Sequence, residues 1–143
     1  MISLTITPAT ESEREWAAQL MANSEPWITL GRGLEQCRKA LSYAEDLLFI
    51  ARAGDKPSGL MLLRRRGLAG APYIASLAVA PDFRSQGLGS PMLAFAEDSF
   101  RPESPHIFLC VSSFNLRARQ LYERLGYSVV GEFKDYVIPD ASE

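Results

Sequence analysis

The chain has 143 residues, with 15 basic and 17 acidic side chains, a formal net charge of −2 and 47% apolar residues. This length suits a single domain over residues 1–143 with its own core. The slightly acidic balance argues against a nucleic-acid or anionic-membrane partner. No apolar run approaches the ~20 residues that span a bilayer, and no secretory signal pattern opens the chain, so we expect a cytoplasmic protein.

Few residues of the metal-binding kinds are present. His106 is the single histidine, so a zinc site of the two-histidine kind cannot be built. Cys37 and Cys110 lie far apart in the sequence and form no C-x-x-C pair. We therefore expect neither a disulfide-stabilised fold nor a metal site built from cysteine thiolates. The chemistry that remains needs no metal.

The first half of the chain predicts a strand, two helices and three further strands. Residues 3–7 alternate as a strand does, and Thr10 with Glu13 has the capping-box spacing of a helix that ends before Ser24. The elements expected next are a helix over 34–42 and strands over 47–53, 59–66 and 73–79. Because the connections between these strands are too short for parallel crossovers, we expect antiparallel pairs.

The second half alternates helices and strands. Its expected elements are a helix over 92–100, a strand over 107–111, a helix over 115–125 with Asn115 at its N-cap and Gly126 at its end, and a strand over 127–133. A helix connects the strand over 73–79 to that over 107–111, so this pair should be parallel. The order predicts an α+β fold with a mixed, mostly antiparallel central sheet, a parallel pair between strands 4 and 5, and about four helices.

The loop between residues 79 and 90 is the most informative segment. Gly87 and Gly89 tolerate unusual dihedral angles, and the following helix contributes its positive end, so several backbone N–H groups can converge on an anion. No Lys follows Gly89, which excludes a Walker A loop, and Met92 stands where a dinucleotide fingerprint needs a third glycine. A turn that merely starts a helix is the alternative interpretation.

Two motifs in a fixed order make the interpretation specific. They are Val79-x-Pro81 with Arg84-x-x-Gly87-x-Gly89, and later Asn115-x-x-Ala118-x-x-Leu121-Tyr122-x-x-x-Gly126-Tyr127. Together they resemble the GNAT superfamily of acyl-CoA-dependent N-acetyltransferases, in detail over 77–133 and in element order over nearly the whole chain. The resemblance implies a three-layer GNAT-like fold and an enzyme whose acyl donor is acetyl-CoA, with no metal.

The resemblance also implies which residues bind the donor. Backbone N–H groups of the loop would hold the CoA diphosphate while Arg84 adds charge, and the end of the preceding strand would pair with the pantetheine arm. The donor would enter between the strands over 73–79 and 107–111, and Asn115 would contact its arm. The residues implied are Leu77, Ala78, Val79, Arg84, Ser85, Gln86, Gly87, Leu88, Gly89, Ser90, Asn115, Ala118 and Tyr122.

By the same resemblance, Tyr122 would face the thioester sulfur and protonate the departing thiolate. A thiolate pKa of ~8.5 and a tyrosine pKa of ~10 make this transfer uphill by roughly 2 kcal/mol, which a general acid can supply. An acceptor amine of pKa ~10.4 is neutral in only about one molecule in 2500 at pH 7, so a base or a dry site must help. Tyr122 also falls on the apolar stripe of its helix, where core packing alone would explain it.

The general base is less evident. Many relatives carry a glutamate five residues before the asparagine, and here Cys110 stands at that position. Four residues of strand span ~13 Å, which excludes a Cys110–His106 nucleophile pair within one strand; a buried small residue is the simpler interpretation of Cys110. By the resemblance, Glu25 lies in the loop where the family builds its acceptor site, and Trp27, Ile28 and Leu30 would either line that pocket or anchor the loop. A solvated Glu25 and a water molecule as base are the alternatives.

Two further departures from the family pattern stand out. Pro91 removes an N–H near the expected cradle and is tolerated only if the helix starts near Leu88. The sequence ends at 140–143, about where a last strand would begin in the family. Either the protein has one strand fewer or the sequence is cut short there, and an uncovered sheet edge would invite pairing with a second copy in a homodimer.

Two functions therefore stay open. The first is direct acetyl transfer from acetyl-CoA to a primary amine of a small molecule or peptide. The second is an acyl-CoA-binding regulatory or interaction domain without transfer activity, which Cys110 and the absent strand favour.

Overall fold

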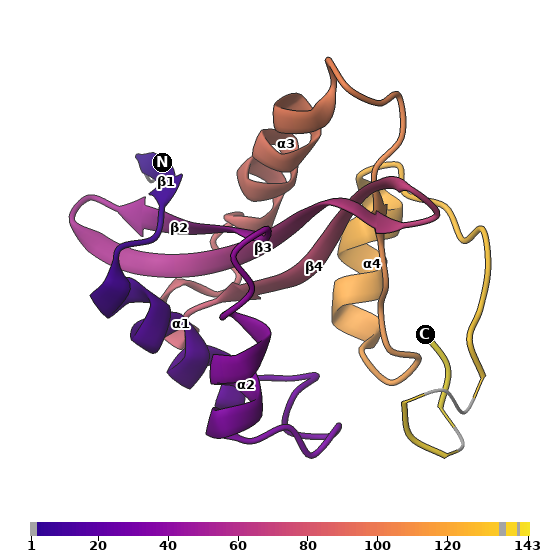
Figure 1. Cartoon of the computed structure of the whole chain (residues 1–143), viewed down its shortest axis with the longest axis horizontal. Coiled ribbons are helices and arrows are strands. Elements are labelled where there is room, and N and C mark those ends of the chain that lie inside the picture. The colour runs from indigo at the N-terminus through magenta and orange to yellow at the C-terminus, as the bar shows by residue number, and fades with distance from the viewer. Residues whose placement is uncertain (1–2, 135–136, 140) are drawn as a thin grey trace.

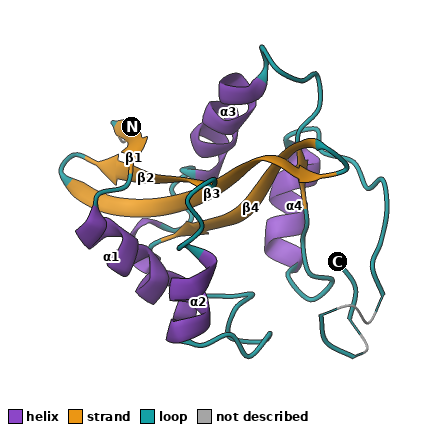
Figure 2. Cartoon of the chain, in the orientation of Figure 1, coloured by secondary structure: helices purple, strands orange, loops and turns teal. Residues whose placement is uncertain are grey.

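The computed structural model describes residues 3–134, 137–139 and 141–143. Its strands form one sheet in the order β1-β2-β3-β4-β5, with β1 Leu4–Pro8, β2 Leu47–Ala53, β3 Lys56–Leu68, β4 Ala71–Val79 and β5 Phe108–Leu109. The first four strands, labelled in Figure 2, pair antiparallel. Strands β4 and β5 pair in parallel. The expected mixed, mostly antiparallel sheet with one parallel pair is confirmed.

Helices lie on both faces of this sheet. In the described part of the chain the α-helices are α1 Glu11–Ala22, α2 Leu34–Ala40, α3 Gly89–Phe100 and α4 Leu116–Arg124. Figure 1 shows α1 and α2 below the sheet and α3 above it. None of these helices is long and apolar enough to cross a bilayer. Helices on both sides of a central sheet confirm the expected three-layer architecture.

Strand β3 explains why the core has two halves. Leu60 and Leu62 pack with α1 and α2, whereas Met61 and Leu63 pack with α3, and all four side chains are at most 1% exposed. Successive side chains of a strand point to opposite faces, so an unbroken apolar run is required in a strand that is covered on both sides. Tyr122 of α4 joins the α3 cluster.

The sheet opens between β4 and β5. Their parallel pairing ends at Ile74 and Leu109. At the same place Ala75 is an extra residue relative to β3, which makes a β-bulge, a feature that ends or redirects pairing. From residue 75 to residue 79, β4 pairs only with β3 among the described residues, and its other edge is open.

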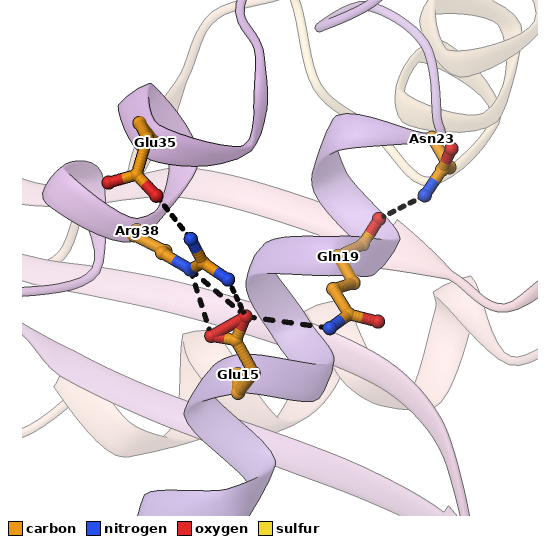
Figure 3. A network of polar contacts seen from close by, with 5 residues as sticks. All are labelled: Glu15, Gln19, Asn23, Glu35 and Arg38. Carbon is orange, nitrogen blue, oxygen red and sulfur yellow. Dashed lines mark hydrogen bonds and ion pairs between the residues drawn. The ribbon is translucent and has the colours of Figure 1, made fainter.

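Helices α1 and α2 are connected by ion pairs across their exposed surfaces. Arg38 of α2 donates to both carboxylate oxygens of Glu15 in α1 at 3.0 Å and also bonds Glu35 (Figure 3). Such exposed pairs contribute little to stability, but they fix how the two helices cross. Asn23, at the end of α1, donates to the Gln19 carbonyl at 2.8 Å.

The strand expected over residues 127–133 is not formed, and that prediction was wrong. Val129 and Val130 are 68% and 78% exposed, and this segment runs outside the sheet (Figure 1). Phe133 exchanges two backbone hydrogen bonds with Glu143, which is a single antiparallel contact rather than a strand. Residues with a preference for strands, such as Val129 and Val130, form one only beside another strand, and β5, expected over 107–111, is only two residues long.

Candidate active site

The loop between β4 and α3 presents its backbone to solvent. One 3₁₀ turn, Pro81–Phe83, follows β4, and then Ser85 and Gly87 adopt positive φ values of 62° and 79°. A Cβ added to Gly87 would meet no atom within 4 Å, so the space above this glycine is open. Leu88 is buried at the start of α3 and holds the far end of the loop on the core.

Six consecutive backbone N–H groups, from Ser85 to Ser90, have no acceptor in hydrogen-bonding geometry among the described residues. The N–H groups just before them are satisfied, because Phe83 and Arg84 bond the carbonyls of the preceding turn at 2.9 and 3.3 Å. Free N–H groups at a helix N-terminus, next to residues of positive φ, form an anion-binding concavity. The loop thus has the chemistry of an anion cradle.

Pro91 does not interrupt this cradle. The N-cap of α3 is Leu88, so Pro91 lies in the first helical turn, where no intrahelical partner exists for an N–H. The expectation that the helix must start near Leu88 is confirmed.

The two loop glycines are required for different reasons. Gly87 supplies a positive φ, which an L-residue adopts at a cost of about 1–2 kcal/mol. Gly89 lets the backbone of α3 come close to the Leu121 side chain of α4, since a Cβ on residue 89 would lie 2.7 Å from Cδ2 of Leu121. Gly89 therefore lets α4 pack against the N-terminus of α3, which brings the second motif beside the first.

Two arginine side chains lie at this loop and behave differently. Arg117, in the first turn of α4, donates to the Ser85 hydroxyl and adds a positive charge beside the free N–H groups. Arg84 turns back instead, because its Nε donates to the Val79 carbonyl at 2.9 Å and its Nη2 to the Ser24 hydroxyl at 3.1 Å. Arg117 was not among the residues predicted from the sequence; a basic residue two positions after the Asn115 cap was the available signal.

The remaining donor-site residues lie around this loop. The Gln86 amide donates to the Asp82 carbonyl at 2.9 Å and closes the loop on itself. Asn115 caps α4 by accepting from the Ala118 N–H at 3.4 Å, which confirms it as an N-cap. In β4, Leu77 and Val79 pack toward α3 and Ala78 packs toward α1 and α2, so the backbone of these residues lies along the open sheet edge.

Tyr122 is half-buried in the α3 cluster, with its ring centroid 6.1 Å from that of Tyr127. Its hydroxyl has no hydrogen-bond partner among the described residues, whereas the Tyr127 hydroxyl donates to Glu97 at 3.0 Å. Burial raises the pKa of Tyr122 to about 12. Tyr122 is therefore a protonated, unengaged donor at neutral pH.

Glu25 is engaged within its own loop. Its carboxylate accepts from the Thr29 N–H at 2.9 Å and from the Thr29 hydroxyl at 2.7 Å, while its side chain stays exposed. In the same loop Trp27 is buried against α1 and α2, and Ile28 is 56% exposed. Trp27 therefore anchors the loop, and Ile28 is the residue that faces outward.

Cys110 is exposed, so its interpretation as a buried small residue was wrong. The strand ends at Leu109, and the chain leaves the sheet before Cys110 can be covered. Cys110 and burial together raise the pKa of the Tyr73 hydroxyl, with burial the larger cause.

A cavity of about 730 Å³ lies elsewhere in the described part of the chain and does not coincide with the loop. It lies between β5, α4 and residues 127–133, and Tyr122 is the one predicted donor-site residue in its wall. Because residues 127–133 do not form a strand, the space beside β5 stays unfilled. The free N–H groups, not the cavity size, mark the candidate site.

Comparisons with known proteins agree with this fold. Three solved structures of similar fold illustrate this. A transcriptional regulator from Bacillus halodurans has 20% identity and a TM-score of 0.74, with 92% of this chain and 97% of that chain covered. Aminoglycoside N-acetyltransferase AAC(6')-Iy in complex with CoA has 16% identity, a TM-score of 0.73 and 95% of each chain covered, and spermidine N-acetyltransferase SpeG from Vibrio cholerae has 19% identity, a TM-score of 0.70 and 97% of this chain and 90% of that chain covered. Identities this low show a shared fold. A search of curated proteins gave no match. The model of the acetyltransferase (GNAT) family matches residues 10–127, and the chain therefore belongs to the GNAT family of acetyltransferases.

Proposed function

We propose that the protein transfers the acetyl group of acetyl-CoA to a primary amine, which attacks the thioester directly. The observation that carries this proposal is the row of six unpaired N–H groups from Ser85 to Ser90 at the N-terminus of α3. The diphosphate of CoA is the part of the donor that such a row recognises. The open space above Gly87 leaves room for it, so these residues fit the donor.

Charge supports the same assignment. The N-terminus of α3 carries roughly half a positive elementary charge, and Arg117, bonded to Ser85, adds a full positive charge at the loop. The pantetheine arm would lie along the open edge of β4 from Leu77 to Val79, where an extended amide-containing chain can pair like an added strand. Asn115 and Ala118, at the start of α4, would contact the arm from the other side.

Tyr122 would act on the leaving group. The amine forms a C–N bond to the acetyl carbon, the C–S bond breaks, and the sulfur leaves with the electron pair. The Tyr122 hydroxyl, which no protein group engages in the described part of the chain, is free to donate its proton to that sulfur. The proton lost by the amine goes to a base.

Water leading to bulk solvent is the base we favour. Both carboxylate oxygens of Glu25 already accept hydrogen bonds from Thr29, so the carboxylate is engaged within its own loop. Glu25 would serve as base only if those bonds broke on acceptor binding.

The acceptor is proposed as a small-molecule or peptide amine. Two solved structures of similar fold are, by name, an aminoglycoside and a spermidine N-acetyltransferase, and both names describe small molecules with several amino groups. The alternative function is an acyl-CoA-binding regulatory domain. Cys110 in place of a glutamate favours it, as does the likeness to a transcriptional regulator.

Calorimetry with acetyl-CoA tests donor binding. We expect the wild-type protein to bind, and Gly87→Val to weaken binding at least 10-fold because a β-branched residue resists φ of +79°. Gly70→Val is the matched control, because Gly70 also has a positive φ of 73° and open space but lies in the β3–β4 turn. Absence of heat with the wild type, or equal losses in both variants, would overturn the proposal.

Turnover separates the two functions. Thiol release from acetyl-CoA over a panel of spermidine, an aminoglycoside and lysine-containing peptides is expected for the enzyme. Binding without release for any amine would support the regulatory domain.

We also propose that a second copy pairs at the open edge beside β5. That edge has no strand partner among the described residues, and Val130 and Phe133 beside it are 78% and 47% exposed. Light scattering should give a dimer for the wild type and a monomer for Val130→Lys. A wild-type monomer would refute the pairing.

A further inference from the structure

The side chain of Arg84 connects two loops that are 60 residues apart in the sequence. Its Nε donates to the carbonyl of Val79, at the end of β4, at 2.9 Å, and its Nη2 donates to the hydroxyl of Ser24, directly after α1, at 3.1 Å. The guanidinium therefore bridges the donor loop and the loop between α1 and α2. The free N–H groups of residues 85–90 begin one residue after Arg84.

Ser24 is a well-defined end point for this bridge. It is 3% exposed, and its hydroxyl donates to the Leu20 carbonyl at 2.5 Å, so its lone pair is directed to Arg84. The segment 24–31 is tied together internally by backbone hydrogen bonds. The Ile28 N–H bonds the Ser24 carbonyl at 3.1 Å, the Leu30 N–H bonds the Pro26 carbonyl at 3.0 Å, and the Gly31 N–H bonds the Ile28 carbonyl at 3.1 Å. A displacement of Ser24 would therefore move this segment as a unit.

We propose that Arg84 is a positioning residue that couples the donor loop to segment 24–31, which we expect to bind the acceptor. The proposal rests on the function proposed above. Arginine suits this role because its planar fork donates in two fixed directions, which a lysine ammonium cannot reproduce. A diphosphate that orders residues 85–90 would hold Arg84, and through it Ser24, in one arrangement; the coupling is reciprocal, so acceptor binding would tighten donor binding.

This role differs from that of a phosphate ligand in what it predicts. If Arg84 positions segment 24–31, Arg84→Ala and Ser24→Ala both raise the acceptor KM about 10-fold and change the donor Kd less. The double variant is then no worse than either single variant, since both remove one contact. If Arg84 only binds phosphate, Arg84→Ala weakens the donor and Ser24→Ala has no effect on acceptor KM.

Matched variants control for other effects of these changes. Ser24→Thr keeps the hydroxyl and should restore the acceptor KM, whereas Arg84→Lys should not. Ser99→Ala removes a serine whose hydroxyl, like that of Ser24, donates to the carbonyl four residues earlier, at 2.7 Å, but has no arginine partner. Ser99→Ala should leave both kinetic constants unchanged.

A second measurement does not depend on turnover. In a Trp16→Phe background, Trp27 is the single tryptophan and its fluorescence reports the position of segment 24–31. We expect acetyl-CoA to shift this emission, and Arg84→Ala or Ser24→Ala to abolish the shift while calorimetry still shows donor binding. A wild-type shift that survives both substitutions, or donor binding without a wild-type shift, would refute the coupling. If acetyl-CoA does not bind at all, the proposed function fails, whereas the contact itself is still tested by non-additive stability losses of the two variants in urea.

Discussion

The hydroxyl of Tyr122 offers the sharpest test of the chemistry. Tyr122→Phe removes one oxygen that has no protein partner among the described residues and keeps the ring that packs against α3 and Tyr127. Deleting an unpaired hydroxyl leaves no orphaned group behind, so we expect stability to change by less than about 1 kcal/mol. Any large effect on rate then reports on chemistry.

The size of the expected effect follows from the environment of the ring. Burial raises the pKa of Tyr122 to about 12, against ~8.5 for a free thiolate, so complete proton transfer is uphill by roughly 5 kcal/mol. An unperturbed tyrosine would give roughly 2 kcal/mol. The same dry surroundings raise the pKa of the thiolate and narrow this gap. General acids contribute about 10²- to 10⁴-fold, so we expect kcat to fall at least about 100-fold with little change in the acetyl-CoA KM.

The pH dependence has a definite sign. Tyr122 must be protonated to act, and with a pKa of about 12 it stays protonated throughout the accessible range. The wild-type kcat should therefore not decrease as the pH rises to about 10. Any decrease of kcat in that range would report the titration of a group other than Tyr122.

The assay is the initial rate of CoA thiol release at saturating acetyl-CoA, from about pH 6.5 to about pH 10. Because Cys110 is an exposed free thiol and the assay detects thiols, both proteins should carry Cys110→Ser. A kcat for Tyr122→Phe within about twofold of the reference at every pH would refute the acid role and leave Tyr122 as a core residue.

Three further outcomes are expected. Arg117→Ala should weaken acetyl-CoA binding about 5-fold by calorimetry, because it removes one exposed charge beside Ser85, whereas Arg124→Ala at the other end of α4 should not. The hydrogen bond from Arg52, followed by that from the Thr10 N–H, holds the pKa of Glu13 below its usual 4.5. The stability that these bonds give is present above pH 4.5 and is lost as the pH falls through the lower pKa of the folded state. The melting temperature of Glu13→Gln should therefore drop less on acidification than that of the wild type. Leu62→Ala, at a position 1% exposed, should cost about 2–5 kcal/mol in urea unfolding, and a loss below about 1 kcal/mol would contradict the two-sided core.

Much of the fold could be predicted because its signals are local. Thr10 and Glu13 form both bonds of the capping box, and Asn115 caps α4, as their spacing indicates. The short turns between β2, β3 and β4 allow only antiparallel pairs, and the helix before β5 gives the parallel one. The donor loop belongs to the same class, because the positive φ of Gly87 and the unpaired N–H groups after it are properties of a strand-loop-helix segment.

The tertiary structure decided what depends on residues far apart in the chain. Residues 127–133 have the alternation of a strand but find no neighbour, and Cys110 is exposed because β5 ends early. Arg84 was expected to face a phosphate, yet the carbonyl and hydroxyl acceptors at Val79 and Ser24 direct its guanidinium toward the loop after α1. Dihedral preferences and capping are written in adjacent residues, whereas the direction of a long charged side chain is set by whichever acceptors the fold brings within its reach.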